Sequence, residues 1–224
     1  MSKPRVEETV HSYAELLDLY EMTGSTVPKW LLDKLGRRER VSDRDDLMAA
    51  ARDCGVPERY VGVVPDPSRN SAMASGTGYY VHGTTGDGKT TRAAELLLGW
   101  VMDGMGSARW VSSVTLLSEI ADTYGGRGSE MEVIARYASC GLLVVDDLGK
   151  ERATEWTLSK LFQLFDERYS QRRPTIVTTQ YGAAELGRMM AKGSGDVATA
   201  QAIVSRIRET YRAIDCGPED RRLG

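Results

Sequence analysis

Apolar residues follow two different periods along this chain. Short apolar runs bounded by turn-forming residues predict strands, whereas apolar residues spaced at helical intervals predict helices. Strands are therefore expected at residues 78–81, 108–112, 142–145, 174–180 and 210–215, and helices at residues 91–105, 114–124, 130–138, 155–173 and 198–208. Helices that alternate with strands predict an α/β fold built on a parallel sheet.

The N-terminal quarter of the chain has its own pattern. Residues 10–35 predict two short helices, the second beginning at Pro28, and residues 46–54 predict another helix. This stretch is too short to bury a large core by itself. We expect residues 1–54 to be a helical partner-docking segment and residues 55–224 to be the main domain.

Composition and charge narrow the possible functions. The formal net charge of −3 argues against a protein that binds nucleic acid through bulk positive charge, so any DNA contact would need a local basic patch. The chain contains no apolar run near the ~20 residues of a membrane span and no apolar signal core at its start. Its cysteines, Cys54, Cys140 and Cys216, lie too far apart in sequence for a zinc motif. We expect a cytoplasmic protein that does not associate with membranes.

A glycine-rich turn between the first predicted strand and helix has the pattern G-x-x-x-x-G-K-[ST], which is typical of a phosphate-binding loop. In such a loop the backbone N–H groups and the helix N-terminus surround phosphate. Lys89 would reach the β- and γ-phosphates, and the Thr90 hydroxyl would bind Mg²⁺. The alternative is a surface turn that matches by chance. The predicted ATP-binding residues of this turn are Gly83, Thr84, Thr85, Gly86, Asp87, Gly88, Lys89, Thr90 and Thr91.

Two carboxylates follow the apolar run at residues 142–145. Adjacent carboxylates are costly to place together unless a cation lies beside them, and the carboxyl end of a parallel strand faces the ligand crevice. We predict that Asp146 holds Mg²⁺ and that Asp147 polarises the attacking water. The alternative is a buried strand that ends in an acidic turn. Gln180, at the tip of the strand at 174–180, would bond the γ-phosphate or its water, or else only cap the strand.

Two common kinds of P-loop protein are excluded by missing motifs. A GTPase would need N-K-x-D, and the only asparagine in the chain is Asn70, ahead of the loop. An ABC-type ATPase would need L-S-G-G-Q, which the sequence lacks. The extra strand predicted at 108–112 favours the sheet order 5-1-4-3-2 of oligomeric ATPases.

Several segments carry a specific resemblance. Residues 142–151 (LLVVDDLGKE) resemble the Walker B signature of the DnaC/DnaI helicase loaders and the IstB transposition ATPases, within the AAA+ class. Residues 54–60 resemble the opening of that family's ATPase domain, residues 155–181 its helix and following strand, and residues 205–209 its S-R-[LI] box. The resemblance spans roughly residues 54–222. It implies a three-layer AAA+ sandwich with a five-stranded parallel sheet.

The resemblance also implies roles for individual residues. Arg206 would be an arginine finger that reaches the γ-phosphate of a neighbouring subunit in a homo-oligomer; otherwise it pairs with Glu209. Tyr60 would line the adenine pocket, although a tyrosine there is also consistent with simple packing. Arg222 would be a second sensor of the nucleotide, a position for which Arg221 competes.

The expected function is that of an ATP-hydrolysing loader of a replicative DNA helicase, which binds single-stranded DNA during replication. DNA contacts would come from residues 119–136 and from Lys150 or Arg152, unless these are ordinary surface charges. One alternative is an IstB-like ATPase that assists a transposase. Another is a nucleotide-gated adaptor with little turnover, because Gln180 stands where the family usually has asparagine.

Overall fold

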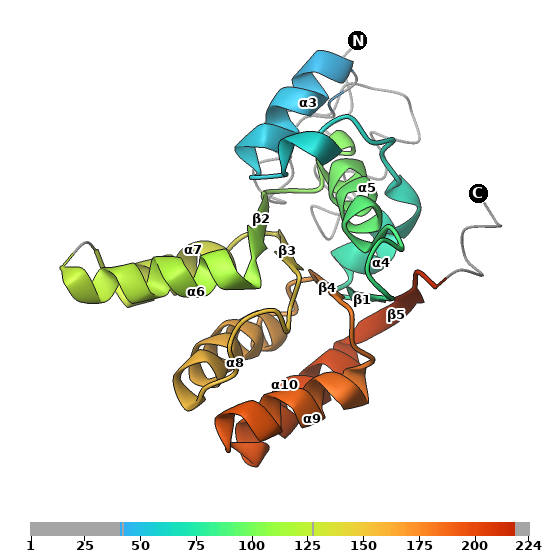
Figure 1. Ribbon diagram of the computed structural model, residues 1–224. Helices are drawn as coiled ribbons and strands as arrows, with labels where there is room; N and C mark the ends of the chain where they lie inside the picture. The colour runs from blue at the N-terminus through green and yellow to red at the C-terminus, as the bar shows by residue number, and fades with distance from the viewer. Residues whose placement is uncertain (1–40, 42, 127, 218–224) are drawn as a thin grey trace, which may run out of the picture.

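The computed structural model describes residues 41, 43–126 and 128–217. Within these residues helical elements precede the first strand, and from that strand onward one or more helices separate each strand from the next (Figure 1). In chain order the elements are α3 (Arg44–Asp53), η2 (Glu58–Tyr60), η3 (Pro67–Arg69), α4 (Asn70–Ala74), β1 (Gly78–His82), α5 (Lys89–Met102), β2 (Ala108–Ser112), α6 (Ser113–Asp122), η4 (Thr123–Gly125), α7 (Glu130–Ala138), β3 (Leu142–Asp146), α8 (Glu155–Ser170), β4 (Thr175–Thr179), α9 (Ala183–Ser194), α10 (Val197–Thr210) and β5 (Tyr211–Asp215).

The strands form one parallel sheet with the order β2-β3-β4-β1-β5. Read from the other edge, this is the predicted order 5-1-4-3-2, so the predicted fold class is confirmed. The strand β4 lies between β1 and β3. As a result, the phosphate loop, which follows β1, and the acidic pair, at the end of β3, lie at the same end of the sheet, the carboxyl end of its strands. Only β4 separates these two strands.

Both faces of the sheet are covered by helices, which explains why the central strands β1, β3 and β4 are buried along nearly their whole length and why β3 is continuously apolar up to Asp146. Successive side chains of a strand point to opposite faces. Leu143 and Val145 therefore belong to one buried cluster, whereas Leu142 and Val144 belong to the other. The period of two expected of a half-exposed strand is absent because neither face of these strands is exposed.

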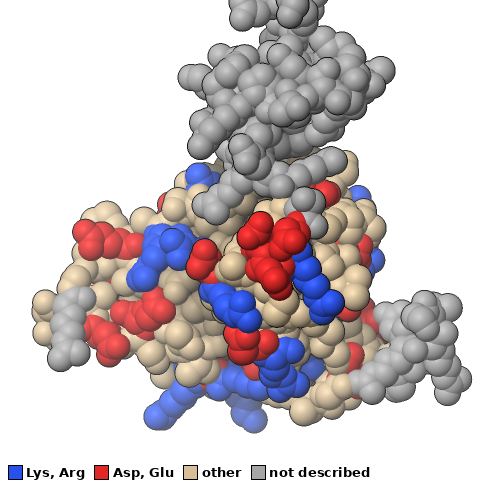
Figure 2. Space-filling view, turned by 90° about the horizontal axis from the view of Figure 1, so that it is seen from above, with Lys and Arg blue, Asp and Glu red and all other residues tan. Residues whose placement is uncertain are grey.

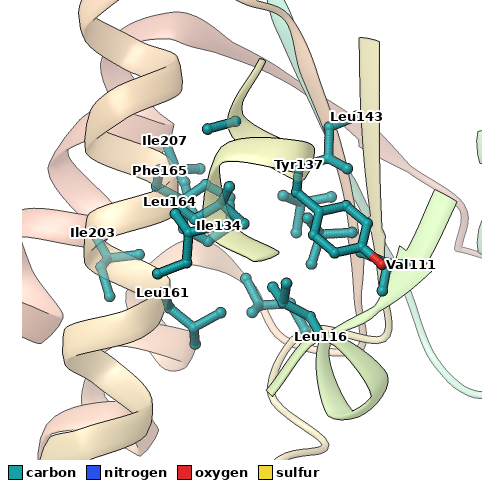
Figure 3. Packing of buried hydrophobic residues seen from close by; sticks show 14 of the residues in the cluster. Val111, Leu116, Ile134, Tyr137, Leu143, Leu161, Leu164, Phe165, Ile203 and Ile207 are labelled. Carbon is teal, nitrogen blue, oxygen red and sulfur yellow. The ribbon is translucent and has the colours of Figure 1, made fainter. Parts of the chain in front are cut away.

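The helices divide into two groups (Figure 1). The helices α3, α4 and α5 pack on one face, and α6 to α10 pack on the other. Figure 3 shows the buried cluster on the face covered by α6 to α10, where Leu164 and Phe165 of α8 pack near Ile134 of α7 and Ile203 of α10. The helices α6 and α7 lie side by side and extend away from the sheet next to its edge strand β2 (Figure 1).

Most of the predicted elements are present, with bounds shifted by a few residues. The helix α9 was not predicted. The two helices expected within residues 10–35 lie outside the described residues. The helix expected at 46–54 is α3, which buries Leu47 and Ala51 in the cluster around α5.

The helix α5 begins differently from several of its neighbours. The side chains of Ser112, Thr154 and Asp196 accept backbone N–H bonds at the starts of α6, α8 and α10. Gly88 precedes α5 in a left-handed conformation and has no side chain to accept such bonds. The N–H groups in the first turn of α5 are therefore left for a ligand, and the partial positive charge of the helix dipole is directed at it.

A buried arginine connects the ends of three elements at the amino end of the strands, which is the end of the sheet opposite the phosphate loop. Arg168 is fully buried, and its guanidinium donates to the carbonyl oxygens of Tyr137, Cys140 and Pro174 and to the Thr175 hydroxyl. Burial lowers the pKa of Arg168. Since its partners here are neutral oxygens, the side chain joins the end of α7 to the starts of β3 and β4 by hydrogen bonds. Across the described residues, no helix combines the length and apolar character needed to cross a membrane.

Candidate nucleotide-binding and hydrolysis site

The phosphate loop links the buried strand β1 to α5. Gly86 and Gly88 have φ angles of 92° and 81°, in the left-handed region that favours glycine. At Gly83 a Cβ atom would come within 3.3 Å of an Asp87 carboxylate oxygen and of the Cys216 backbone, so a larger residue would crowd the turn. Gly83 and Gly88 thus show why the motif requires glycine at its two fixed positions, whereas Gly86 lies at a variable one.

The cation of the loop lies inside its curl. Lys89 is only 8% exposed, and its Nζ donates to the carbonyl oxygen of Thr84 at 2.6 Å. The Thr84 hydroxyl in turn donates to Asp87 Oδ2 at 2.6 Å. The loop therefore holds its ammonium group where a phosphate oxygen can replace the Thr84 carbonyl as its partner.

The first carboxylate after β3 is buried against two threonines. Asp146 Oδ1 accepts the hydroxyl of Thr178 at 2.5 Å and that of Thr90 at 3.3 Å. Burial is the largest influence on this carboxyl and raises its pKa; the negative charge of Asp147 raises it further, against the opposing effect of the Thr178 and Thr90 hydrogen bonds. The hydrogen bonds that the protein supplies therefore do not offset the cost of burying the ionised carboxylate.

This arrangement fits a divalent cation. Thr90 Oγ1 and Asp146 Oδ1 are hard oxygen donors on adjacent elements, which is the donor type that Mg²⁺ prefers. Mg²⁺ commonly takes one or two protein oxygens and completes its shell with phosphates and water. In the described part of the chain, no group of three or more His, Cys, Asp or Glu is arranged to hold a metal ion.

Asp147 begins a tight turn and has a positive φ of 59°, which is unusual for a residue with a side chain. Its backbone N–H donates to the Thr178 hydroxyl at 2.8 Å, and its carboxylate accepts Lys150 Nζ at 2.7 Å. Thr178 therefore contacts both acidic residues. Sequence reasoning missed Thr178, although three polar residues at the end of an apolar strand were a visible signal of a site.

A cavity of about 400 Å³ brings many of the predicted site residues together, although Gly83, Thr84, Asp87, Asp146 and Arg206 are not in its wall. The phosphate loop and α5, the turn after β3, the tip of β4 and the entrance of the domain each contribute part of its wall. It is lined by Arg59, Tyr60, Thr85, Gly86, Gly88, Lys89, Thr90, Thr91, Asp147, Leu148, Lys150 and Gln180. Four segments far apart in sequence thus meet around one opening. Arg59 lies over the Tyr60 ring at 4.6 Å and was not predicted to take part.

Another cavity, of about 500 Å³, lies at the opposite edge of the sheet between the ends of α8 and α10. Arg168, Arg172 and Arg173 are in its wall. Helix C-termini disfavour anions, and the Arg168 guanidinium already bonds to the main chain. The smaller cavity is the better candidate for a nucleotide because it contains the phosphate loop.

Gln180 lies at the cavity wall with an exposed side chain. Its Nε2 donates to the hydroxyl of the neighbouring Tyr181 at 2.9 Å. The amide is therefore held at the carboxyl end of β4, which is the same end of the sheet as the phosphate loop. Its role toward phosphate or water stays a prediction.

Arg206 lies apart from the other predicted residues, on α10. Its Nε and Nη2 contact Asp166 Oδ1 of α8 at 2.7 and 2.5 Å, and its guanidinium lies 4.7 Å from the centre of the Phe162 ring. The predicted alternative partner, Glu209, instead accepts the hydroxyl of Tyr169. Arg206 does not line the nucleotide cavity of its own chain, and a finger acting in trans does not need to. Arg222 and its competitor Arg221 lie outside the described residues.

The parallel sheet, the phosphate loop and the acidic strand end define a P-loop ATP-binding domain of the AAA+ type. The chain belongs to the family of IstB-like ATP-binding proteins, whose profile matches residues 78–223. The resemblance inferred from the Walker B segment is thereby confirmed.

Solved structures of replication proteins share this fold. The DnaC helicase loader is 21% identical, with a TM-score of 0.53, and the match covers 79% of this chain and 91% of that one. DnaI is 20% identical, with a TM-score of 0.54 and coverage of 80% and 87%. AMPPCP-bound DnaA from Aquifex aeolicus is 20% identical, with a TM-score of 0.51 and coverage of 71% and 50%. No curated protein matches the chain.

Proposed function

We propose that this chain is an ATPase that binds ATP with Mg²⁺ and hydrolyses the terminal phosphoanhydride. The observation that carries the proposal is the single cavity lined by Lys89, Thr90 and Asp147, with the buried Asp146 bonded to Thr90 behind it. A loop that only held phosphate would not need a second acidic residue in the wall of the cavity.

When bound, ATP with Mg²⁺ supplies the bond to be cleaved and a cation that neutralises charge on the phosphate oxygens. Lys89 would exchange its bond to the Thr84 carbonyl for phosphate oxygens. Thr90 and Asp146 would hold the metal. Asp147 would orient the attacking water and accept its proton, which requires Lys150 to release the carboxylate it now pairs with. Gln180 would help to place that water.

The proposed recognition of the base rests on the entrance to the cavity. Tyr60 and Arg59 stand together in the wall and form a cation–π pair. A flat aromatic ring backed by a guanidinium suits the stacking of a purine. Arg222 would complete the pocket as a sensor of the nucleotide.

The proposed cellular role is that of a cytoplasmic loader of a replicative helicase on single-stranded DNA. The fold shared with the DnaC helicase loader and with DnaI supports this role. In this proposal the subunits form a homo-oligomer with Arg206 acting in trans, and residues 1–54 contact the partner. Since α3 at the end of that segment packs on α5, partner docking would fall mainly to residues 1–40.

A second role has its own support. The family profile that matches residues 78–223 is that of IstB-like proteins, which favours an ATPase that assists a transposase. A nucleotide-gated adaptor with little turnover is a third role. It is supported by Gln180, whose amide bonds to Tyr181 in this structure.

The proposed DNA contacts lie on α6 and α7 and on the turn after β3. Arg136 on α7 pairs with Glu119 on α6 at 3.3 Å, so DNA would have to compete with a carboxylate for it. Figure 2 shows acidic and basic side chains interleaved over one face of the molecule, without a continuous basic stripe. Binding of single-stranded DNA would therefore depend on a few local phosphate contacts.

Substitution of Lys89 tests the nucleotide site. Lys89→Ala removes charge-assisted hydrogen bonds to phosphate, and we expect the Kd for ATP to rise about 10- to 100-fold. Fluorescent-nucleotide titration measures this, and steady-state phosphate release measures turnover. Lys192→Ala, an exposed lysine on α9, is the matched control. Equal phosphate release by wild type and Lys89→Ala would refute the proposed hydrolysis.

Substitution of the predicted DNA contacts tests the DNA-binding role. Each lost phosphate contact should reduce the slope of log K against log salt by about 0.7 for a single strand. We expect Arg136→Ala and Arg152→Ala each to weaken binding of an oligonucleotide in this way, with Lys192→Ala as the control. Unchanged slopes for both variants would remove these residues from the DNA-binding surface.

The partner is tested with the full chain. If the loader role is correct, ATP-bound full-length protein should form a complex with the replicative helicase of its host on size-exclusion chromatography. A complex with a transposase and none with the helicase would favour the IstB-like role instead.

A further inference from the structure

A buried glutamate closes the turn that carries Asp147. Glu151 is 9% exposed, and one of its oxygens, Oε2, accepts two hydrogen bonds. The Gly149 backbone N–H donates at 2.9 Å and the Ser113 hydroxyl at 2.6 Å. Neither the motif nor the proposed chemistry assigns a role to this carboxylate.

The turn it closes has an uncommon backbone path. Asp147 and Gly149 have φ angles of 59° and 97°. A Cβ atom on Gly149 would lie 2.9 Å from the Tyr181 ring, so this glycine meets both a conformational and a steric requirement. Such a conformation persists only where the surrounding structure fixes it.

The two ends of the turn are fixed by different elements. Thr178 on β4 accepts the Asp147 N–H, and its carbonyl oxygen accepts the Leu148 N–H. Beyond Gly149, the turn is fixed by the bond to Glu151. Asp147, whose N–H is one of these anchored groups, is among the residues that line the nucleotide cavity.

Ser113 connects the same turn to α6. It is the first residue of that helix, and its side chain is fully buried. Its hydroxyl oxygen lies 2.6 Å from Glu151 Oε2 and 3.1 Å from the carbonyl oxygen of Asp147. A hydroxyl has a single proton, so the shorter contact to the carboxylate is the stronger bond. The start of α6 and the Asp147 turn are thus joined through Glu151.

We propose that Glu151 is a positioning residue for ATP hydrolysis: bonded to Ser113 and to Gly149, it holds the turn that aims Asp147 at the nucleotide cavity. This inference rests on the proposed ATPase function. It also means that α6, the first of the two helices proposed to contact DNA, is mechanically connected to the proposed base.

The hydrogen bonds of Glu151 make it possible to distinguish a positioning role from a role in proton transfer. Both hydrogen bonds converge on one oxygen of Glu151. The amide oxygen of glutamine can accept the same two bonds, whereas glutamine cannot take up a proton as a carboxylate does. Glu151→Gln should therefore keep the turn in place, and Glu151→Ala should not.

The experiment measures kcat and the Kd for ATP in wild type, in four single variants at Glu151, Ser113 and Glu155, in one double variant and in Lys89→Ala. We expect Glu151→Ala to lower kcat about tenfold or more, since small misplacements of a catalytic group are costly, with Kd within about twofold of wild type. Glu151→Gln should retain a kcat within about threefold of wild type. Ser113→Ala should lower kcat in the same direction, and Glu155→Ala, an exposed glutamate nearby, should have no effect.

The double variant Glu151→Ala/Ser113→Ala should be no slower than Glu151→Ala, because both changes break one linkage. An unchanged Kd shows that the variants are folded. The positioning role is overturned, with the ATPase intact, if Glu151→Ala turns over like wild type or if Glu151→Gln is as slow as Glu151→Ala. If wild type is no faster than Lys89→Ala, the ATPase proposal and this inference both fall.

Discussion

Arg206→Ala is expected to lower kcat for ATP hydrolysis by about 10³–10⁵-fold, the range observed when an arginine finger is removed. The guanidinium would stabilise the negative charge that develops on the transferred phosphoryl group. Steady-state phosphate release at high protein concentration, which would favour the proposed oligomer, measures the effect. Arg208→Ala, an exposed arginine two residues away on α10, is the matched control.

A mixing experiment tests whether Arg206 acts in trans. Lys89→Ala subunits keep their arginine but have a defective site, whereas Arg206→Ala subunits have an intact site without a finger. In an equal mixture half of the sites are intact and half of their neighbours carry the arginine, so about a quarter of the wild-type rate should return. No recovery in the mixture would exclude action between subunits.

The Asp166 contact gives the competing explanation for Arg206. In this structure the guanidinium lies between Asp166 and Phe162 and joins α10 to α8. A partly exposed ion pair of this kind contributes about 0–1 kcal/mol to stability. An arginine finger that left Asp166 for a phosphate would lose this small contribution and gain the contact with the phosphate. If Arg206 only joins the helices, Arg206→Ala will lower the Tm slightly and leave kcat unchanged.

Asp147→Asn is expected to lower kcat by about 10²–10⁴-fold, because asparagine cannot accept the proton of the attacking water. The Kd for ATP should stay within about threefold of wild type, since in the proposed mechanism the side chain acts on the water rather than on the bound nucleotide. Single-turnover hydrolysis together with nucleotide titration separates the two quantities.

Asp122→Asn, an exposed aspartate at the end of α6, is the control for this substitution. A parallel rise in Kd and fall in kcat would contradict the role of Asp147 as a base and indicate a role in nucleotide binding. A faster variant would mean that the ion pair with Lys150 governs the site instead.

The fold was predictable because its strands are buried on both faces. A continuous apolar run such as residues 142–145 is typical of a strand covered by helices on both sides, and the helices between the strands indicated a parallel sheet. The helix α9 was missed although Leu186, Met189 and Met190 recur in it at helical spacing; Gly187 and Gly193, which are poor helix formers, obscure the pattern. Only Leu186 and Met190 are buried in it, and Gly187 lies against Val204 of α10, a close contact that no local pattern encodes.

The candidate site was predictable to the extent that its chemistry is local. Lys89 and Thr90 follow from the spacing of the loop, and Asp146 and Asp147 from their place at a strand end. The residues of other strands that contact this acidic pair, such as Thr178, could not be identified in the same way. Their contacts depend on which strands are neighbours in the sheet.

The sequence by itself determined the class of the domain, the loop that would surround phosphate and the acidic pair beside it, because these depend on spacing within one strand–turn–helix unit. The tertiary structure decided which side chains hold that pair. Insertion of β4 between β1 and β3 places Thr178 against Asp146, and the packing of α6 brings Ser113 to Glu151. It also decided that Arg206 meets Asp166 across two helices. Contacts between residues far apart in the chain follow from the order of the sheet, which local periodicity does not contain.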